Sequence, residues 1–384
     1  MGMTRGANLV ATVVLSLFLT RTRLRKALLT HATEDGSAAL SGDQRRGVDL
    51  AGLTEQLPRL PGPLAREREA CRKQAVRFLE TAAAGGFVPV TWDDPAFPAH
   101  LTALEDRPAV LWLRGDRSAL DRPAVAIVGS RRASPYAVQV AEQLAAEVSR
   151  HGVTVVSGLA RGVDAAAHRG ALAGPGSTVA VVGSGVDVVY PSEHAALADR
   201  IAGTAGSAVV SELPPGTPPL RHHFPRRNRL ISGMSRGVVI VEATFRSGSL
   251  ITARCAAEQG RDVMAVPGNV LSGRSRGAHA LIRDGAKIVE TADDILEELG
   301  MPVVAADEAQ PATRSAEGQP FARGLDPVLG RMDPGEAYSV DELAEQSGMD
   351  GVALLRKLTD LEIEGRVLRV ANGRFVRTPD RMLT

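Results

Sequence analysis

The densest cluster of reactive side chains lies between positions 221 and 236, where five arginines and no acidic residue occur. It begins with Arg221-His222-His223-Phe224-Pro225-Arg226-Arg227-Asn228-Arg229. The whole chain has 45 basic and 44 acidic side chains, a net charge of +1, so the cluster is a local feature. Arginines that follow phosphates, beside a ring that stacks on a base, are typical of sites for single-stranded nucleic acid. A solvated basic face with a buried Phe224 is the alternative, and we favour binding.

Three glycine-rich turns carry hydroxyl or guanidinium groups that can hold a phosphate. Helix-start amides, hydroxyls and guanidinium groups together suit an anion, whereas a tight turn with capping serines is the structural alternative. The three turns contain Gly129, Ser130 and Arg131; Ser157, Gly158 and Arg161; and Ser247, Gly248, Ser249 and Thr252.

Two acids and a histidine lie near these turns. Asp164 and His168 are four residues apart on one face of a predicted helix. We expect Asp164 to cap that helix and the two side chains to bond each other, since no nucleophile marks a catalytic dyad. Glu242 follows an apolar strand and is expected to pair with an arginine of the basic segment.

Several kinds of site are not predicted. No Gly-Lys dipeptide occurs, which excludes a Walker-type loop, and Gly183-x-Gly185 lacks the third glycine of a dinucleotide fingerprint. Cys71 and Cys255 are too few for a disulfide scaffold or a cysteine zinc site. We therefore expect no cofactor and no metal, and a reducing cytoplasm fits this cysteine content. The rings are also few, with 8 Phe, 3 Tyr and 2 Trp, so base stacking must use very few of them.

Short apolar strands alternate with amphipathic helices between positions 121 and 300. Apolar strands without polar alternation indicate a parallel sheet covered on both faces, so we predict a doubly wound α/β domain. Ligands of such sheets bind beyond the carboxyl ends of the strands, where the glycine-rich turns fall. The predicted strands are 124–128, 153–156, 178–182, 208–212, 238–241 and 262–266, with helices at 136–150, 164–172, 193–201 and 250–259. Two shorter strands are predicted upstream, at 87–90 and 109–113.

The N-terminal part reads as helical patches separated by loops. The apolar run from Ala7 to Leu19 is shorter than a membrane span, which needs about 20 residues. It resembles a signal-peptide core in length, but no small-x-small site follows it, so we predict a buried or poorly ordered helix. A charged helix is expected at 66–84, with loops at 34–47 and 57–63.

The C-terminal part has a separate plan. Residues 301–325 have no periodicity and are predicted to be a linker. Ser339 is expected to cap a short helix, a second helix follows over 352–363, and 367–376 reads as a hairpin with a type I′ turn. Helix, turn, helix and hairpin within 326–384 predict a winged helix. Its charges are nearly balanced, so DNA binding and a protein contact are both open roles for it.

The ordered motifs resemble the DNA-processing protein A family (DprA, also called Smf). The resemblance spans roughly residues 125–290, and Trp92–Pro98 and Leu111–Asp116 extend it upstream. It rests on the three turns, Ala167-His168, Tyr190-Pro191, Ser211-Glu212, the 224–229 segment, Ser247–Ala253 and Val266-Pro267-Gly268.

The resemblance implies an extended Rossmann-like domain that binds single-stranded DNA. Members protect incoming DNA in natural transformation, load the RecA recombinase onto it, act as homodimers and are not established enzymes. We accordingly expect a helical region of SAM or helix-hairpin-helix type over 1–75, the Rossmann-like domain over 76–300, the linker and the winged helix. A clear helix-hairpin-helix glycine pattern is missing from 1–65.

The resemblance also implies roles for individual residues. Arg131 and Arg221 take the positions of phosphate-contacting residues, and Phe224 that of a base-contacting ring. Position 221 is often Lys in the family, so Arg221 retains the charge but changes the geometry. The family's Arg-Asn-Arg element falls on Arg227, Asn228 and Arg229.

Two other functions remain alternatives. The first is a nucleotide phosphoribohydrolase of the lysine-decarboxylase-like family, whose P-G-G-x-G-T-x-x-E loop would fall near Ser247–Thr252. The paired glycines and the glutamate of that loop are missing here. The second is a transcription regulator that binds duplex DNA through 326–384.

Overall fold

The computed structural model describes residues 5–20, 50–60, 62–301, 326–333, 336–370 and 373–378. The predicted loop at 34–47 and nearly all of the predicted linker lie outside these residues.

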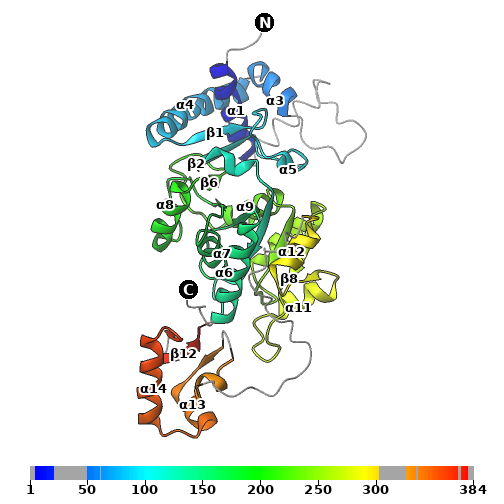
Figure 1. Ribbon diagram of the computed structural model, residues 1–384. Coiled ribbons are helices and arrows are strands. Elements are labelled where there is room, and N and C mark those ends of the chain that lie inside the picture. Colours follow the sequence, from blue (N-terminus) through cyan, green and yellow to red (C-terminus); the bar gives the residue numbers. More distant parts are fainter. Residues whose placement is uncertain are drawn as a thin grey trace.

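A single sheet of nine strands organises the larger part of the chain (Figure 1). Its order is β1-β2-β6-β5-β4-β3-β7-β8-β9, and the seven strands from β6 to β9 run parallel. The doubly wound parallel sheet predicted from the apolar runs is therefore confirmed. The strands are β1 (Val88–Thr91), β2 (Val110–Gly115), β3 (Ala124–Val128), β4 (Thr154–Ser157), β5 (Thr178–Val181), β6 (Ala208–Ser211), β7 (Gly237–Ile240), β8 (Asp262–Ala265) and β9 (Lys287–Ile288).

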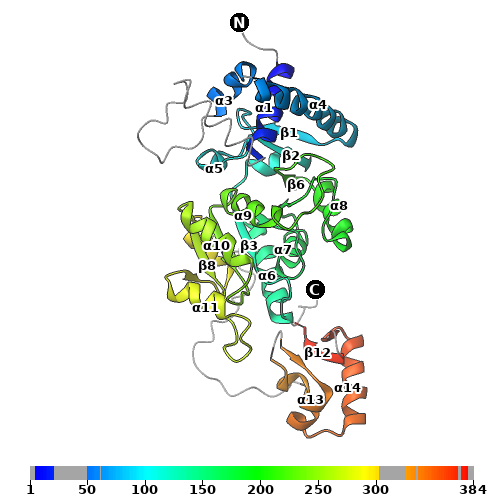
Figure 2. The ribbon, with the colours of Figure 1, turned by 180° about the vertical axis from the view of Figure 1, so that it is seen from behind.

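Helices cover both faces of this sheet, as the fully buried strands require (Figures 1 and 2). Within β3, Val125 and Ile127 pack with α6 (Pro135–Arg150), α7 (Val163–Ala171) and α12 (Ala292–Glu298). The alternate β3 residues face α9 (His223–Gly233), α10 (Ser249–Glu258) and α11 (Arg276–Arg283). Helix α8 (Ala195–Gly203) packs separately against β5 and β6.

The chain reverses its winding at β3. From β3 it proceeds to β4, β5 and β6 on one side, and then returns to place β7 on the other side of β3. The carboxyl ends of β3 and β7 therefore form the topological switch point, the usual ligand position in open α/β sheets.

Strand β2 joins the sheet to the N-terminal helices. It runs antiparallel to both β1 and β6, so the two upstream strands extend the parallel sheet. Trp112 of β2 faces a core with α1 (Arg5–Thr20), α3 (Leu50–Gln56) and α4 (Gly62–Gly85), while Leu113 faces the main core. Leu15 and Phe18 of α1 are fully buried there, which confirms the buried helix predicted for the apolar run.

Two expectations for the N-terminal part differ from the structure. The predicted loop at 57–63 contains a short 3-10 helix, Leu57–Arg59, and the first residues of α4. Helix α4 also crosses the expected boundary at 75/76, because Ala75 is buried in the core that α4 shares with β2. A four-residue helix, α5 (Ala99–Thr102), follows between β1 and β2.

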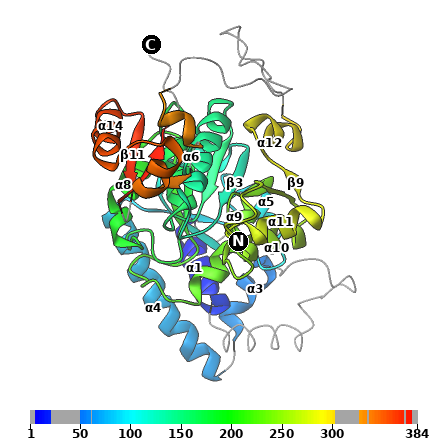
Figure 3. The same ribbon diagram turned by 90° about the horizontal axis from the view of Figure 1, so that it is seen from below.

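The C-terminal residues form a winged helix, seen in Figure 3 with α14 and β11 labelled. Ser339 caps α13 (Val340–Ser347) in a capping box with Glu342, as predicted. Helix α14 (Gly351–Ile363) packs over a three-stranded sheet of order β10-β12-β11, formed by Ala337–Tyr338, Arg374–Arg377 and Val367–Val370. Of the predicted Asn372-Gly373 turn, Asn372 lies outside the described residues.

Among the described helices, none combines the length and the apolar character that crossing a membrane requires.

Candidate nucleic-acid interface

A hollow of about 760 Å³ lies at the switch point, and we call it the switch-point pocket. Its walls come from the turn after β3, the start of α9, the segment after β7 and the start of α10. Eleven of the sequence-predicted site residues line it: Gly129, Ser130, Arg131, Arg221, Phe224, Arg227, Asn228, Ser247, Gly248, Ser249 and Thr252.

The turn after β3 is fixed by close packing and by hydrogen bonds. A Cβ atom at Gly129 would lie 2.7 Å from Val163 Cγ2, so the position requires glycine. The Ser130 amide donates to the Glu242 carbonyl at 2.7 Å, and the Ser130 hydroxyl accepts from the Arg132 amide at 3.1 Å. These bonds tie β3 to β7 and leave the guanidinium of Arg131 exposed at the mouth of the pocket.

A cluster of two aromatic rings and an arginine forms the part of the pocket best suited to bind a base. The Phe224 and Tyr190 rings lie 5.5 Å apart between centroids, tilted by 50°. The guanidinium carbon of Arg131 lies 5.4 Å from the centroid of the Phe224 ring, a cation–π distance. Tyr190 is 49% exposed and was not among the predicted site residues; the signal available was one of only three tyrosines, placed before a proline.

Most of the basic segment forms a helix that was not among the predicted elements. Helix α9 starts at His223, so Phe224 and Pro225 belong to its first turn, where proline is tolerated because the amides there lack intrahelical partners. Arg221 lies just before the helix, exposed and in the pocket wall. The start of α9 thus brings Arg221 and Phe224 to the pocket, whereas Arg227 and Arg229 turn inward.

Arg227 is one of these inward arginines, with 6% exposure. Its guanidinium donates to the carbonyls of Gly158 and Val181 and lies beside Asp164, whose carboxylate accepts from the Gly158 and Ala160 amides. Burial lowers the pKa of Arg227 to about 10 and raises that of Asp164. This pair fixes the second glycine-rich turn against α9. The N-cap of α7 is Gly162, so the prediction that Asp164 caps this helix was wrong. Asp164 lies in the first turn of α7, and its carboxylate bonds the amides of the glycine-rich turn before the helix.

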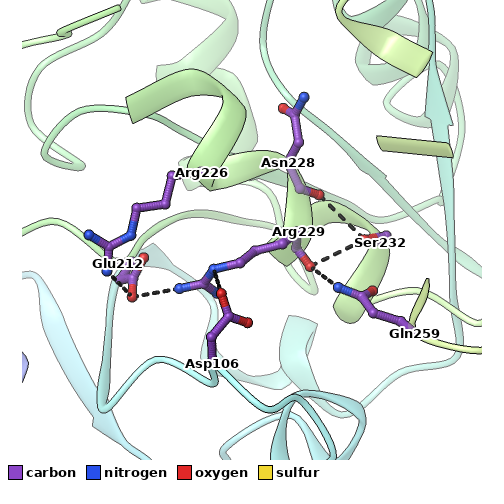
Figure 4. A network of polar contacts seen from close by, with 7 residues as sticks. All are labelled: Asp106, Glu212, Arg226, Asn228, Arg229, Ser232 and Gln259. Atoms are coloured by element: carbon purple, nitrogen blue, oxygen red, sulfur yellow. Dashed lines mark hydrogen bonds and ion pairs between the residues drawn. The ribbon is translucent and has the colours of Figure 1, made fainter. Parts of the chain in front are cut away.

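Arg229 lies away from the pocket, contrary to the role predicted for it. It forms ion pairs with Glu212 at 2.8 Å and with Asp106 at 2.9 Å, and only 8% of it is exposed (Figure 4). Arg226 also reaches Glu212, at 3.3 Å. A guanidinium held between two carboxylates ties α9 to the ends of β6 and α5 and is not presented to a ligand.

The start of α10 supplies hydroxyl groups to the pocket. The Ser247 and Ser249 hydroxyls lie 2.7 Å apart, and Asn228 donates to the Gly248 carbonyl at 3.3 Å. This contact holds α9 and α10 together at the pocket, where Ser247, Gly248 and Ser249 line the same hollow as Arg131 and Arg221.

The second glycine-rich turn contributes less directly. Ser157 is buried and donates to the Ile127 carbonyl at 2.7 Å, so its hydroxyl serves the sheet. Gly158 and Arg161 line a smaller cavity beside Tyr190 and Phe224. Arg161 is exposed and forms a bidentate pair with Glu193, at 2.7 Å for both contacts. Such an exposed pair contributes little and can exchange for a phosphate.

The two acids that line the pocket are already engaged. Glu242 accepts from the Ser134 hydroxyl at 2.6 Å and from the Ser134 amide, so the expected pairing with an arginine of the basic segment was wrong. Asp164 holds the amides described above. Neither carboxylate is presented as a general base.

The expected bond between Asp164 and His168 is also not formed. The Nδ1 atom of His168 lies 2.7 Å from the Thr178 hydroxyl, which itself donates to the Val155 carbonyl. His168 is fully buried, and this burial lowers its pKa to about 3. The histidine therefore stays neutral and acts within the core between α7 and β5.

This buried histidine predicts acid sensitivity. Because the folded pKa of about 3 lies below the value of 6.5 for an exposed histidine, the unfolded chain binds the extra proton as the pH falls below 6.5. The stabilising contribution is complete above pH 6.5 and is lost toward pH 3. Lowering the pH from 7 to 5 should cost about 2 kcal/mol through this group, measured by urea unfolding.

The matched variants are His168→Asn, which keeps a donor toward Thr178 but cannot titrate, and His222→Asn at an exposed histidine. The first should lose about 2 kcal/mol less than the wild type between the two pH values, and the second should behave as the wild type. Equal losses in all three proteins would contradict the assignment.

Two segments match the spacing of a hydrolase nucleophile elbow, Gly233–Gly237 and Gly273–Gly277. An elbow requires a strand that turns sharply into a helix with the serine at the tip. Ser235 instead follows α9, is buried and donates to the Ile231 carbonyl. Ser275 is a buried residue ten positions after β8. Neither serine is placed as a nucleophile.

Comparison with known proteins agrees with this architecture. Residues 89–300 match the family model of DNA recombination-mediator protein A, and residues 305–373 match the DprA winged helix domain. Protein Smf of Escherichia coli is 40% identical over 286 residues, which cover 74% of this chain and 76% of that protein. DNA processing protein DprA of Streptococcus pneumoniae is 45% identical over 205 residues, 53% and 72% of the two chains.

Solved structures show the same likeness. The X-ray structure of DNA processing protein A from S. pneumoniae has a TM-score of 0.60 at 34% identity and covers 78% of this chain and 99% of that one. DNA processing protein A from Helicobacter pylori, described for its unique single-stranded DNA binding mode, has a TM-score of 0.50 at 30% identity over 56% of this chain and 95% of that one.

Proposed function

Because this chain belongs to the DNA recombination-mediator protein A family, we propose that it binds single-stranded DNA in the switch-point pocket and delivers that DNA to the RecA recombinase. The observation that carries the proposal is the cluster of Phe224, Tyr190 and Arg131 at the mouth of the pocket. Rings that line a pocket beside a cation suit an unpaired base, whereas the bases of a duplex are stacked on each other and inaccessible to the rings.

The phosphates of the strand have separate partners in this proposal. Arg131 and Arg221 are exposed in the pocket wall, and the start of α10 adds the hydroxyls of Ser247 and Ser249. These groups recognise the backbone without reading the sequence, so affinity should depend steeply on salt and weakly on base composition. Arg227 supports the pocket from below, and Arg229 is not part of the contact surface.

We propose a binding role without catalysis, since both acids of the pocket are engaged by neighbouring protein groups.

The protection of incoming single strands during natural transformation and the homodimeric state are part of the same proposal. Light scattering measures that state.

Delivery to RecA is tested by the time that RecA needs to form filaments on labelled single strands. Wild-type protein should shorten this lag, and Phe224→Ala, which weakens the DNA site, should shorten it less at equal concentration. Equal lags with and without the wild-type protein, under conditions where it binds the DNA, would contradict delivery while leaving the binding site intact.

A further inference from the structure

A second hollow, of about 700 Å³, lies between the N-terminal helices and the segment that leads into α9. We call it the helical groove. One wall is formed by α1 and α4, through Leu17, Gln74, Arg77 and Phe78. The other wall is formed by Leu213, Pro214, Thr217, His222, His223 and Arg226. Its size is within the range of ordinary ligand sites, about 300–1,000 Å³.

The lining of the helical groove is basic and contains rings. It includes Arg77, Arg226 and two histidines, and no aspartate or glutamate. Arg77 is exposed, Phe78 is half-buried, and the rings of His222 and His223 lie 4.4 Å apart between centroids. Arg226 shares Glu212 with Arg229, so its charge is only partly offset. Cations beside rings repeat the chemistry of the switch-point pocket.

The two hollows are lined by neighbouring residues at the start of α9. Arg221 and Phe224 line the switch-point pocket, whereas His222 and His223, between them in the chain, line the helical groove. Gly183 lies under this turn, since a Cβ atom there would be 3.2 Å from Phe224 Cδ1 and 3.6 Å from the His223 carbonyl carbon. A strand that stacks on Phe224 therefore has one helical turn to pass before it reaches the groove.

We propose that the helical groove is a second subsite for single-stranded DNA, in which the strand continues from the switch-point pocket onto α4. Arg77 and Arg226 contact phosphates there, and the rings of Phe78 and His222 contact bases. This inference rests on the proposed function. It assigns a nucleic-acid contact to the N-terminal helices.

The subsite predicts that its contribution depends on oligonucleotide length. We would titrate labelled oligo-dT of about 4 to about 16 nucleotides with wild-type protein and with Arg77→Ala/Phe78→Leu, at two salt concentrations. Leucine keeps the apolar contact of Phe78 with the N-terminal core while removing the ring. The variant should bind the shortest oligonucleotide as the wild type does, and the longest about tenfold more weakly. Its salt slope for the longest should fall by about 1, one phosphate contact.

Arg72→Ala is the matched control, because Arg72 is an exposed arginine of the same helix that pairs with Glu69 and does not line the groove. It should bind every length as the wild type does. Equal binding of the longest oligonucleotide by Arg77→Ala/Phe78→Leu and wild type would overturn the subsite. Failure of the wild type to bind even the longest single strand would instead overturn the proposed function.

Discussion

Phe224→Ala is expected to lower the affinity for single-stranded DNA by about 10- to 100-fold, because stacking on one ring contributes about 1–3 kcal/mol per base. The ring also contacts Tyr190 and the guanidinium of Arg131, so its removal takes a packing partner from both groups. Arg131→Ala should weaken binding less, and should reduce the salt slope by about 1 as one phosphate contact is lost. Fluorescence anisotropy with labelled oligo-dT measures both effects.

Phe245→Ala provides the matched control. Phe245 is 59% exposed, follows β7 and does not line the switch-point pocket. Its removal should leave affinity within about twofold, since a ring outside the site contributes no stacking. If Phe224→Ala and Phe245→Ala both bound as the wild type, the ring cluster would have no role in binding. The double variant Arg131→Ala/Phe224→Ala should lose less than the sum of its single variants, because the two groups touch.

Arg227→Met is expected to destabilise the fold by about 3–5 kcal/mol, the usual cost of leaving a buried charge without its partner. Asp164 would stay buried while losing its cation, and the Gly158 and Val181 carbonyls would lose their donor. Adding Asp164→Asn should restore part of the loss, since the uncompensated charge is then removed. Urea unfolding of the full chain measures all of these variants.

The same substitution at Arg221 separates stability from binding. Arg221 is exposed in the pocket wall, so Arg221→Met should change stability by less than about 0.5 kcal/mol while weakening DNA binding. Arg227→Met should instead act mainly on stability, which it lowers strongly. If Arg227→Met were as stable as the wild type and bound DNA more weakly, Arg227 would be a direct contact and the buried ion pair would be misassigned.

Much of the fold can be predicted from local sequence patterns. Residues 124–128 and 238–241 are apolar runs without polar alternation, which indicates buried parallel strands before any partner is known. The spacing of turns after these strands also placed Gly129, Ser130 and the Ser247–Thr252 segment at one edge of the sheet, where the structure has them.

What the sequence could not supply were contacts between distant segments. Arg227 and Arg229 resemble Arg221 in sequence, yet Asp164, Asp106 and Glu212 decide that they turn inward, and no spacing rule connects those positions. The helical state of α9 was missed because Pro225 and the arginines mask the apolar Leu230 and Ile231, which face the core. Tyr190 becomes a site residue only when the segment after β5 brings it to Phe224.

The switch-point pocket as a single-stranded DNA site is tested most directly by comparing labelled oligo-dT with a duplex of matched length. Anisotropy titrations of wild type and Arg221→Ala/Phe224→Ala at two salt concentrations are sufficient. We predict that the wild type binds the single strand more tightly than the duplex, that affinity falls steeply with salt, and that the double variant loses the single strand. Equal affinity for the duplex, together with an unaffected double variant, would contradict the switch-point pocket as a single-stranded DNA site.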